Sequence, residues 1–162
     1  MPLPRLDALS LPVDGRQSAT ALAVALGTRR LLASHDYSSL PEVTLASGRR
    51  ADLLALGPDG ALWIIEIKSS VADFRADGKW PDYRDYCDRF FFAVPEDFPT
   101  EILPEDTGLI VADAYGAATL REAPEHRLAG ARRKAVMLRF AHAAAGRLHS
   151  LVDPQGASGR MG

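Results

Sequence analysis

The chain of 162 residues is 47% hydrophobic, enough to bury one sizeable core and little beyond it. It has no apolar run near the roughly 20 residues of a membrane-spanning helix, and its first residues lack the charged and apolar regions of a secretory signal. A single cysteine, Cys87, excludes an internal disulfide or a cysteine-rich zinc site, and its aromatic neighbours predict a small core residue. We expect one cytoplasmic, nucleoid-associated domain over 15–150, with a loose arm at 1–14 and a flexible tail at 151–162.

The hydrophobic pattern predicts an α/β domain with a mixed sheet. A helix is expected from about Arg16 to Ala33, where apolar residues recur at helical spacing. Strands are expected at residues 39–45, around Asp52 and Glu66, at 89–94, and as a pair at 108–112 and 118–121. The remaining segments are a polar connection at 70–78, a short helix at 80–88 and a closing helix at 131–147. Strand, helix and strand at this spacing predict a right-handed parallel crossover.

The middle of the chain predicts a β-hairpin with two carboxylates and a lysine on one face. Its turn is Gly57-Pro58-Asp59-Gly60, in which proline presets φ and glycine takes the left-handed position. If the turn closes as a three-residue loop, Asp52 lies directly across from Glu66, with Cβ atoms roughly 5 Å apart. Lys68, two residues beyond Glu66, then points the same way. Because facing carboxylates repel, a divalent metal and the Lys68 ammonium would stabilise the pair.

The residues around Glu66 support this interpretation. Trp63, Ile64, Ile65 and Ile67 form the apolar run of a strand buried on both faces. A charge inside such a strand is costly without a partner. A Glu–Lys pair on the exposed face of a strand is the alternative, but the aspartate placed on the same face favours a functional site.

Three segments carry a family resemblance: Arg50–Leu53, Ile65–Ser70 and Lys79–Phe90. They resemble the MmcB-like DNA repair proteins of bacteria, within the PD-(D/E)XK nuclease superfamily. The resemblance runs from about Gln17 to His149, with Ala51 where the superfamily's name has proline. It implies a restriction-endonuclease-like core, αβββαβ with flanking helices, and metal-dependent hydrolysis of DNA in repair, by endo- or exonuclease action. Some superfamily members bind DNA without cutting it, so a non-cleaving repair accessory protein is the alternative function.

The resemblance also implies roles for the hairpin residues. Asp52 and Glu66 would hold one or two Mg²⁺ or Mn²⁺ ions, with the backbone carbonyl of Ile67 as a further oxygen ligand. Lys68 would position or help to deprotonate the attacking water, or stabilise the developing negative charge.

Glu42 is a further acidic candidate for the site, and its place depends on one turn. If the loop is Ala46-Ser47-Gly48, Leu45 pairs with Arg49 and Glu42 faces Asp52. If the loop is Ser47-Gly48 alone, the register slips by one residue and Glu42 misses the site.

Charge is distributed unevenly along the chain, although the net charge is only −2. Residues 121–150 carry seven Lys or Arg and two acids, whereas residues 73–120 carry four and eleven. A basic segment beside a carboxylate-rich one is consistent with a DNA-binding surface, although an Arg-rich surface helix would look the same. The DNA-binding candidates are Arg49, Arg50, Lys79, Arg132, Arg133, Lys134 and Arg139. DNA is the expected partner, and pairing with a second copy or with other repair proteins stays open.

Overall fold

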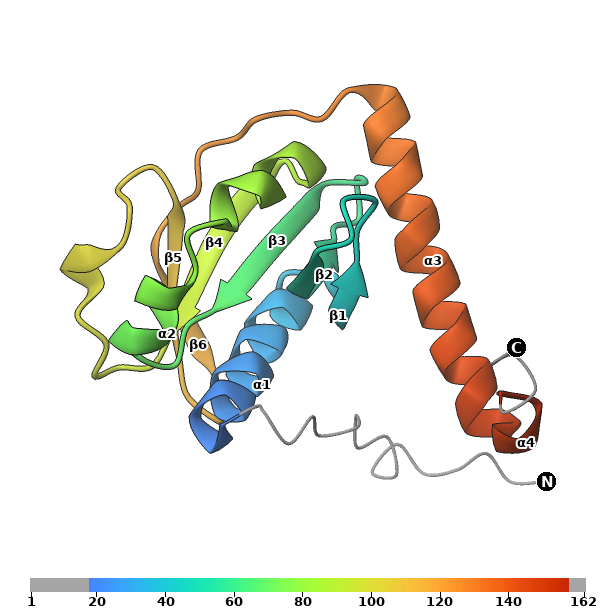
Figure 1. Cartoon of the computed structure of the whole chain (residues 1–162), viewed down its shortest axis with the longest axis horizontal. Coiled ribbons are helices and arrows are strands. Elements are labelled where there is room, and N and C mark those ends of the chain that lie inside the picture. The colour runs from blue at the N-terminus through green and yellow to red at the C-terminus, as the bar shows by residue number, and fades with distance from the viewer. Residues whose placement is uncertain (1–17, 158–162) are drawn as a thin grey trace.

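A six-stranded mixed sheet in the order β1-β2-β3-β4-β5-β6 forms the centre of the fold (Figure 1). The computed structural model describes residues 18–157. The strands are β1 (Ser38–Thr44), β2 (Arg50–Leu56), β3 (Leu62–Ile67), β4 (Arg89–Val94), β5 (Gly108–Ala112) and β6 (Ala117–Arg121). The helices are α1 (Ala19–Ser34), α2 (Val71–Ala76), α3 (Gly130–Val152) and α4 (Pro154–Ala157), with 3-10 turns η2 (Trp80–Tyr86) and η3 (Thr100–Ile102). The predicted arm at 1–14, residues 16–17 of the first predicted helix and the tail beyond 157 lie outside the described residues.

The pairing of the strands confirms the predicted mixed sheet. Strands β1, β2 and β3 form an antiparallel meander. Strand β4 lies parallel to β3, and β5 lies parallel to β4. Strand β6 then returns antiparallel to β5. The chain passes from β3 through α2 and η2 to β4, which lies parallel to β3, so the parallel pairing that the strand–helix–strand spacing predicted is confirmed.

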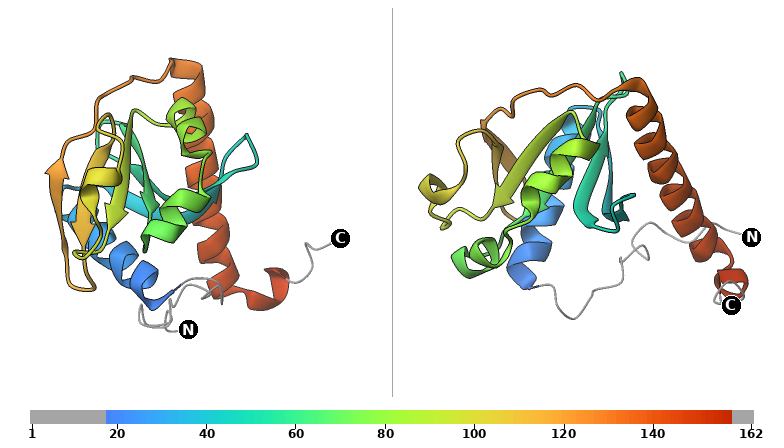
Figure 2. Two further views of the ribbon diagram at one scale, coloured as in Figure 1. Left: turned by 60° about the vertical axis from the view of Figure 1, so that its left-hand side comes forward. Right: turned by 45° about the horizontal axis from the view of Figure 1, so that its top comes forward.

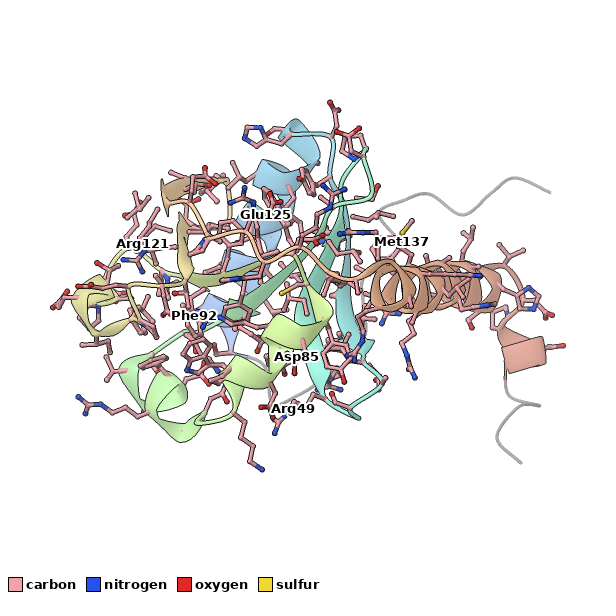
Figure 3. The ribbon with its side chains drawn as sticks, turned by 90° about the horizontal axis from the view of Figure 1, so that it is seen from above. Arg49, Asp85, Phe92, Arg121, Glu125 and Met137 are labelled. Carbon is pink, nitrogen blue, oxygen red and sulfur yellow. The ribbon has the colours of Figure 1, made fainter. Side chains whose placement is uncertain are left out.

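Helices cover both faces of this sheet (Figure 2). Helix α1 packs Val24 and Leu32 into one core cluster with Ile65 and Phe91. On the other face, η2 and α3 close a second cluster that includes Cys87, which is 2% exposed as predicted. Seen from above, Phe92 of β4 lies in the interior, and α3, marked by Met137, stands to one side of the sheet (Figure 3).

The predicted polar connection at 70–78 is wrong, because it contains helix α2. Ser70 caps this helix by accepting a hydrogen bond from the amide of Asp73 at 3.1 Å. The serine and aspartate three residues apart form a capping pattern that precedes a helix. The pattern was present in the sequence, but a helix of six residues has too little apolar periodicity to reveal itself.

The closing helix is also longer than predicted. Helix α3 runs from Gly130 to Val152, so the predicted boundary between domain and tail at residue 150 falls inside it. No proline follows Gly130 until Pro154, which begins α4, and nothing stops the helix earlier. Although α3 has 23 residues, none of the helices described between 18 and 157 is apolar enough to span a membrane.

Candidate functional site

The β2–β3 hairpin adopts the predicted register. The amide of Gly57 donates to the carbonyl of Ala61 at 2.8 Å, which closes the three-residue loop, and Gly60 has a φ of 86°. Leu53 pairs with Ile65, so Asp52 is the next residue across from Glu66. The turn sequence thus fixes which side chains meet at the other end of the hairpin.

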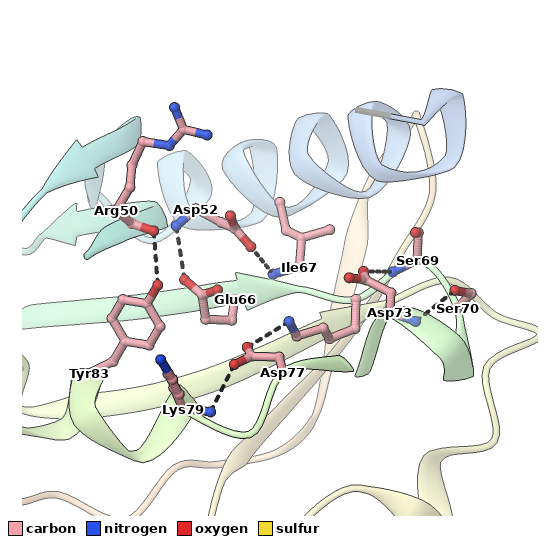
Figure 4. Close-up of polar contacts among 11 residues, drawn as sticks. Arg50, Asp52, Glu66, Ile67, Ser69, Ser70, Asp73, Asp77, Lys79 and Tyr83 are labelled. Atoms are coloured by element: carbon pink, nitrogen blue, oxygen red, sulfur yellow. Dashed lines mark hydrogen bonds and ion pairs between the residues drawn. The ribbon is translucent and has the colours of Figure 1, made fainter. Parts of the chain in front are cut away.

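Beyond the Leu53–Ile65 pair, hydrogen bonds from backbone amides to side-chain carboxylates take the place of the backbone–backbone hydrogen bonds between β2 and β3 (Figure 4). The amide of Asp52 donates to Glu66 Oε1 at 2.9 Å, and the amide of Ile67 donates to Asp52 Oδ2 at 2.8 Å. Each carboxylate therefore satisfies an amide of the opposite strand. These bonds bring the two acidic side chains together where the regular pairing of β2 and β3 ends.

The pair is held in conditions that disfavour two negative charges. Glu66 is 4% exposed, and Asp52 is partly buried. Burial raises the pKa of Asp52, and burial together with the nearby charge of Asp52 raises the pKa of Glu66 well above its ordinary value. The pair therefore retains a proton at pH values where exposed carboxyl groups have lost theirs. A cation bound between the two carboxylates would favour the loss of that proton.

Lys68 lies beside the pair and is 5% exposed. Its ammonium donates to Asp77 Oδ2 at 2.8 Å. Burial acts to lower the pKa of Lys68, but the hydrogen bond and the charge of Asp77 outweigh it, and the pKa is raised. Lys68 therefore stays a cation.

Two acidic residues after β3, Asp73 and Asp77, shape the site and were not predicted to belong to it. Asp73 of α2 accepts the amide of Ser69, and Asp77 at the end of α2 accepts both the Lys68 ammonium and the amide of Lys79. The signal for Asp73 was the capping pattern that begins at Ser70. No local signal pointed to Asp77, because its role depends on how α2 folds back over Lys68.

Tyr83 of η2 also lies beside the carboxylate pair. Its hydroxyl donates to the carbonyl of Arg50 at 2.9 Å, which ties η2 to the start of β2. Burial, followed by the charges of Glu66 and Asp52, raises the pKa of Tyr83. The phenol therefore stays protonated and keeps this hydrogen bond.

Glu42 has the predicted register but does not join the pair. Leu45 donates to Arg49 at 2.8 Å, which confirms the longer turn and places Glu42 across from Asp52. Glu42 has a φ of 52°, however, and its carboxylate lies 3.8 Å from the Arg50 guanidinium. The positive φ bends β1 at this residue, and alternation alone could not predict it.

The predicted DNA-binding residues lie in two groups. Arg49, Arg50 and Lys79 flank the pair: Arg49 binds Asp82 of η2 at 3.0 Å, and Lys79 is exposed at the start of η2. Figure 3 places Arg49 on the same side of the molecule as Asp85 of η2. Arg49 and Arg50 precede Asp52 by three and two residues, so the three cations lie at or beside the starts of β2 and η2.

The second group lies on α3, and Arg133 in this group is tied into the fold. Its guanidinium binds both oxygens of Asp88 at 2.6 Å and the carbonyl of Gly60 at 2.8 Å. Gly60 is in the hairpin turn, about 20 Å of strand from Glu66. Arg132 stacks 4.8 Å over the Tyr86 ring, while Lys134 is exposed and Arg139 lies 3.4 Å from the carbonyl of Thr44.

The carboxylates of Asp52 and Glu66 provide some of the oxygen ligands that a hard divalent cation requires. Among residues 18–157, no group of three or more His, Cys, Asp or Glu side chains could hold a metal ion. Asp52 and Glu66 are two carboxylates, and Mg²⁺ is often held by one or two carboxylates together with waters and substrate phosphates. Their raised pKa values are the observation that fits a cation, because a positive charge between them would offset both burial and repulsion.

Comparisons with known proteins place the chain in a family. A family model described as "DNA repair protein MmcB-like" matches residues 10–155. The solved structure of the SPO1766 protein of Silicibacter pomeroyi, of unknown function, is 48% identical, with a TM-score of 0.83. The match covers 86% of this chain and 96% of that one. No curated protein matches the chain.

Proposed function

Because this chain belongs to the MmcB-like family of DNA repair proteins, we propose that it is a metal-dependent nuclease that hydrolyses phosphodiester bonds of DNA. The paired carboxylates of Asp52 and Glu66 carry the proposal. They lie side by side, with Glu66 buried and Asp52 partly buried, their pKa values are raised, and Lys68 lies next to them. Packing alone gives no reason for this combination, because two repelling carboxylates cost stability.

The arrangement of the strands supports the finer fold assignment. Helix α1, three antiparallel strands, helix α2 and a parallel strand follow one another, as in the αβββαβ core of the PD-(D/E)XK superfamily. Asp52 lies on the second strand of this core, and Glu66 and Lys68 lie at the end of the third. The proposal therefore includes membership of that superfamily.

Each residue has a proposed role. Asp52 and Glu66 hold Mg²⁺ or Mn²⁺, with the Ile67 carbonyl as a third oxygen donor. When bound, the cation supplies an activated water and neutralises charge on the phosphate. Lys68 acts as a cation that orients the attacking water or the scissile phosphate, because Asp77 keeps it protonated and so disfavours a role as general base. Asp77 is a positioning residue for Lys68.

The cations around the pair would bind the DNA backbone. Arg49, Arg50 and Lys79 lie on the two elements that flank Asp52, the start of β2 and the start of η2. Phosphate contacts of this kind position DNA without reading its sequence. Arg133 is excluded from this group because Asp88 occupies its guanidinium.

A nuclease screen tests the proposal. Single strands, flaps, junctions and mispaired duplexes are incubated with Mg²⁺ or Mn²⁺ and the wild-type protein. Lys68→Ala should abolish cleavage and leave metal binding nearly intact, whereas Asp52→Ala should lose both. Asp59→Ala, an exposed acid in the far turn of the hairpin, is the matched control and should cut like wild type. Equal cleavage by wild type and Lys68→Ala would rule out the proposed role of Lys68.

A non-cleaving DNA-binding repair accessory protein is the second candidate. The observation that favours it is that both carboxylates already bond to backbone amides and that Lys68 already has a partner in Asp77. The three polar residues would then hold the strands and α2 together. This candidate predicts DNA binding, no cleavage of any substrate, and no effect of divalent cations on stability.

A further inference from the structure

A hollow of about 480 Å³ lies between β1 and α3, outside the carboxylate pair. Its lining residues are Glu42, Val43, Thr44, Leu138, Arg139, His142, Ala143 and Arg147. Its lining therefore combines basic side chains with apolar ones. Its one carboxylate, that of Glu42, already lies beside the Arg50 guanidinium. The hollow consequently favours a ligand that combines negative charge with an apolar surface.

The wall of the hollow is built from hydrogen bonds between α3 and the edge strand. Arg147 donates to the carbonyls of Pro41 and Glu42 at 2.5 and 2.6 Å. These bonds hold the bend in β1 where Glu42 has its positive φ. Arg139 and His142 are exposed, and Arg139 makes a long hydrogen bond of 3.4 Å to the carbonyl of Thr44. Arg147 therefore supports the wall, while Arg139 and His142 can reach a ligand.

The strand register places the hollow one strand away from the carboxylate pair. Glu42 lies across from Asp52, and neighbouring strands are about 4.8 Å apart. A chain that occupies the hollow and crosses β1 therefore arrives next to Asp52. Its size is in the range of pockets that hold small organic ligands, whereas a double helix is too wide to enter it.

We propose that this hollow binds one unpaired nucleotide of a DNA strand whose neighbouring phosphate reaches Asp52 and Glu66. The phosphate of that nucleotide lies against Arg139 and His142, and the base packs on Leu138 and Val43. The inference rests on the proposed function, and it adds that the preferred DNA has a single-stranded portion next to the site.

Binding measured without divalent cations separates this inference from catalysis. A fluorescein-labelled duplex with a single-stranded overhang and a blunt duplex are titrated in EDTA, at several salt concentrations, by fluorescence anisotropy. The Arg139→Ala/His142→Ala double variant should bind the overhang DNA more weakly than wild type does. Its salt slope should fall by about 0.7 to 1.4, for one or two contacts to a single strand. Its affinity for blunt duplex should stay the same.

Two further variants test the hollow itself. Ala143→Phe fills it without changing charge, so it should weaken binding of the overhang DNA and leave the salt slope unchanged. Arg127→Ala removes an exposed cation outside the hollow and should bind both DNAs like wild type. Circular dichroism and thermal unfolding verify that each variant is folded.

Three results of the DNA titrations would overturn the inference: a wild type that binds overhang and blunt DNA equally, an equal loss on both DNAs in the double variant, or no loss at all. Tighter binding of an acidic peptide than of the overhang DNA would assign the hollow to a protein partner instead and would also overturn it. The proposed function fails separately, if wild type cuts no substrate and binds no divalent cation, because these variants leave Asp52 and Glu66 in place.

Discussion

Glu66 is 4% exposed and accepts a hydrogen bond from the amide of Asp52 on the neighbouring strand. Because folding buries this carboxyl group, its protonation is linked to folding. Its pKa in the folded protein is well above that in the unfolded chain, chiefly because of burial. As pH rises above about 4.3, the unfolded chain releases this proton while the folded protein keeps it. The unfolded state then binds fewer protons, so stability falls with rising pH until the folded carboxyl has also ionised.

A Glu66→Gln variant should therefore be more stable than wild type at pH 7–8 in EDTA. The amide keeps an oxygen that can accept the Asp52 hydrogen bond, but it carries no charge to bury. Thermal unfolding measures the effect, and each kcal/mol gained should raise the Tm by roughly 2–4 °C. The advantage should disappear as pH falls below about 4, because wild-type Glu66 then becomes neutral in both states. A variant less stable than wild type at pH 8 would contradict the proposed burial cost.

Saturating Mn²⁺ should reverse the order of stability, so that wild type becomes more stable than Glu66→Gln. Ligand that binds only the folded state stabilises it, so wild type should gain stability and Glu66→Gln should gain little. The comparison is made by repeating the same unfolding experiment with the cation present. Equal gains for both proteins would place the cation elsewhere.

At the scale of the elements, α1 is fixed against the sheet by a close backbone approach at Gly27. A Cβ atom built there would lie 2.0 Å from the carbonyl oxygen of Asp113 and 2.4 Å from that of Gly116. Gly27→Ala should therefore push α1 away from the β5–β6 turn and destabilise the fold, at a cost typical of overpacking, about 1–3 kcal/mol.

Gly146→Ala on α3 is the matched control for that substitution. Nothing lies within 4 Å of the Cβ that it would add, so alanine should stabilise the helix by roughly 0.5–1 kcal/mol. Chemical denaturation of both variants gives the two free energies of unfolding. If Gly27→Ala were as stable as wild type, the close packing of α1 described here would be incorrect.

The hairpin and its register could be predicted because their determinants are local. The Gly57–Gly60 turn fixed the pairing of Asp52 with Glu66 from neighbouring residues alone. The same reasoning gave Glu42 its correct register but could not anticipate its positive φ. That bend depends on Arg147, which lies 105 residues further along the chain.

Contacts that depend on distant elements could not be predicted. Asp88 is 5% exposed and accepts hydrogen bonds from Leu62, Leu128 and the Arg133 guanidinium. Burial acts to raise the pKa of Asp88, but Arg133 and the two amides keep it lowered. In the sequence, Arg133 was simply part of a basic run, and nothing marked it as the partner of a buried carboxylate 45 residues away.

Across the whole molecule, the two ends of the hairpin have different roles. At the turn end, Asp88 and Arg133 join the hairpin to η2 and α3 by satisfied hydrogen bonds. At the other end, Asp52 and Glu66 carry carboxylates whose ionisation burial and mutual repulsion disfavour, beside the ammonium of Lys68. The chain belongs to a DNA repair family, and we propose that a divalent cation is the ligand of this cluster.

Calorimetric titration of Mn²⁺ into wild type and Asp52→Asn tests that claim most directly. The asparagine keeps an oxygen to accept the amide of Ile67, so the hairpin should stay folded while the charge is lost. Wild type should bind Mn²⁺ with release of protons, measured as a heat that varies with the ionisation enthalpy of the buffer, because the pair holds a proton that the cation displaces. Asp52→Asn should bind far more weakly. Equal binding by the two proteins, or no binding by wild type, would contradict the assignment of Asp52 and Glu66 as a metal site.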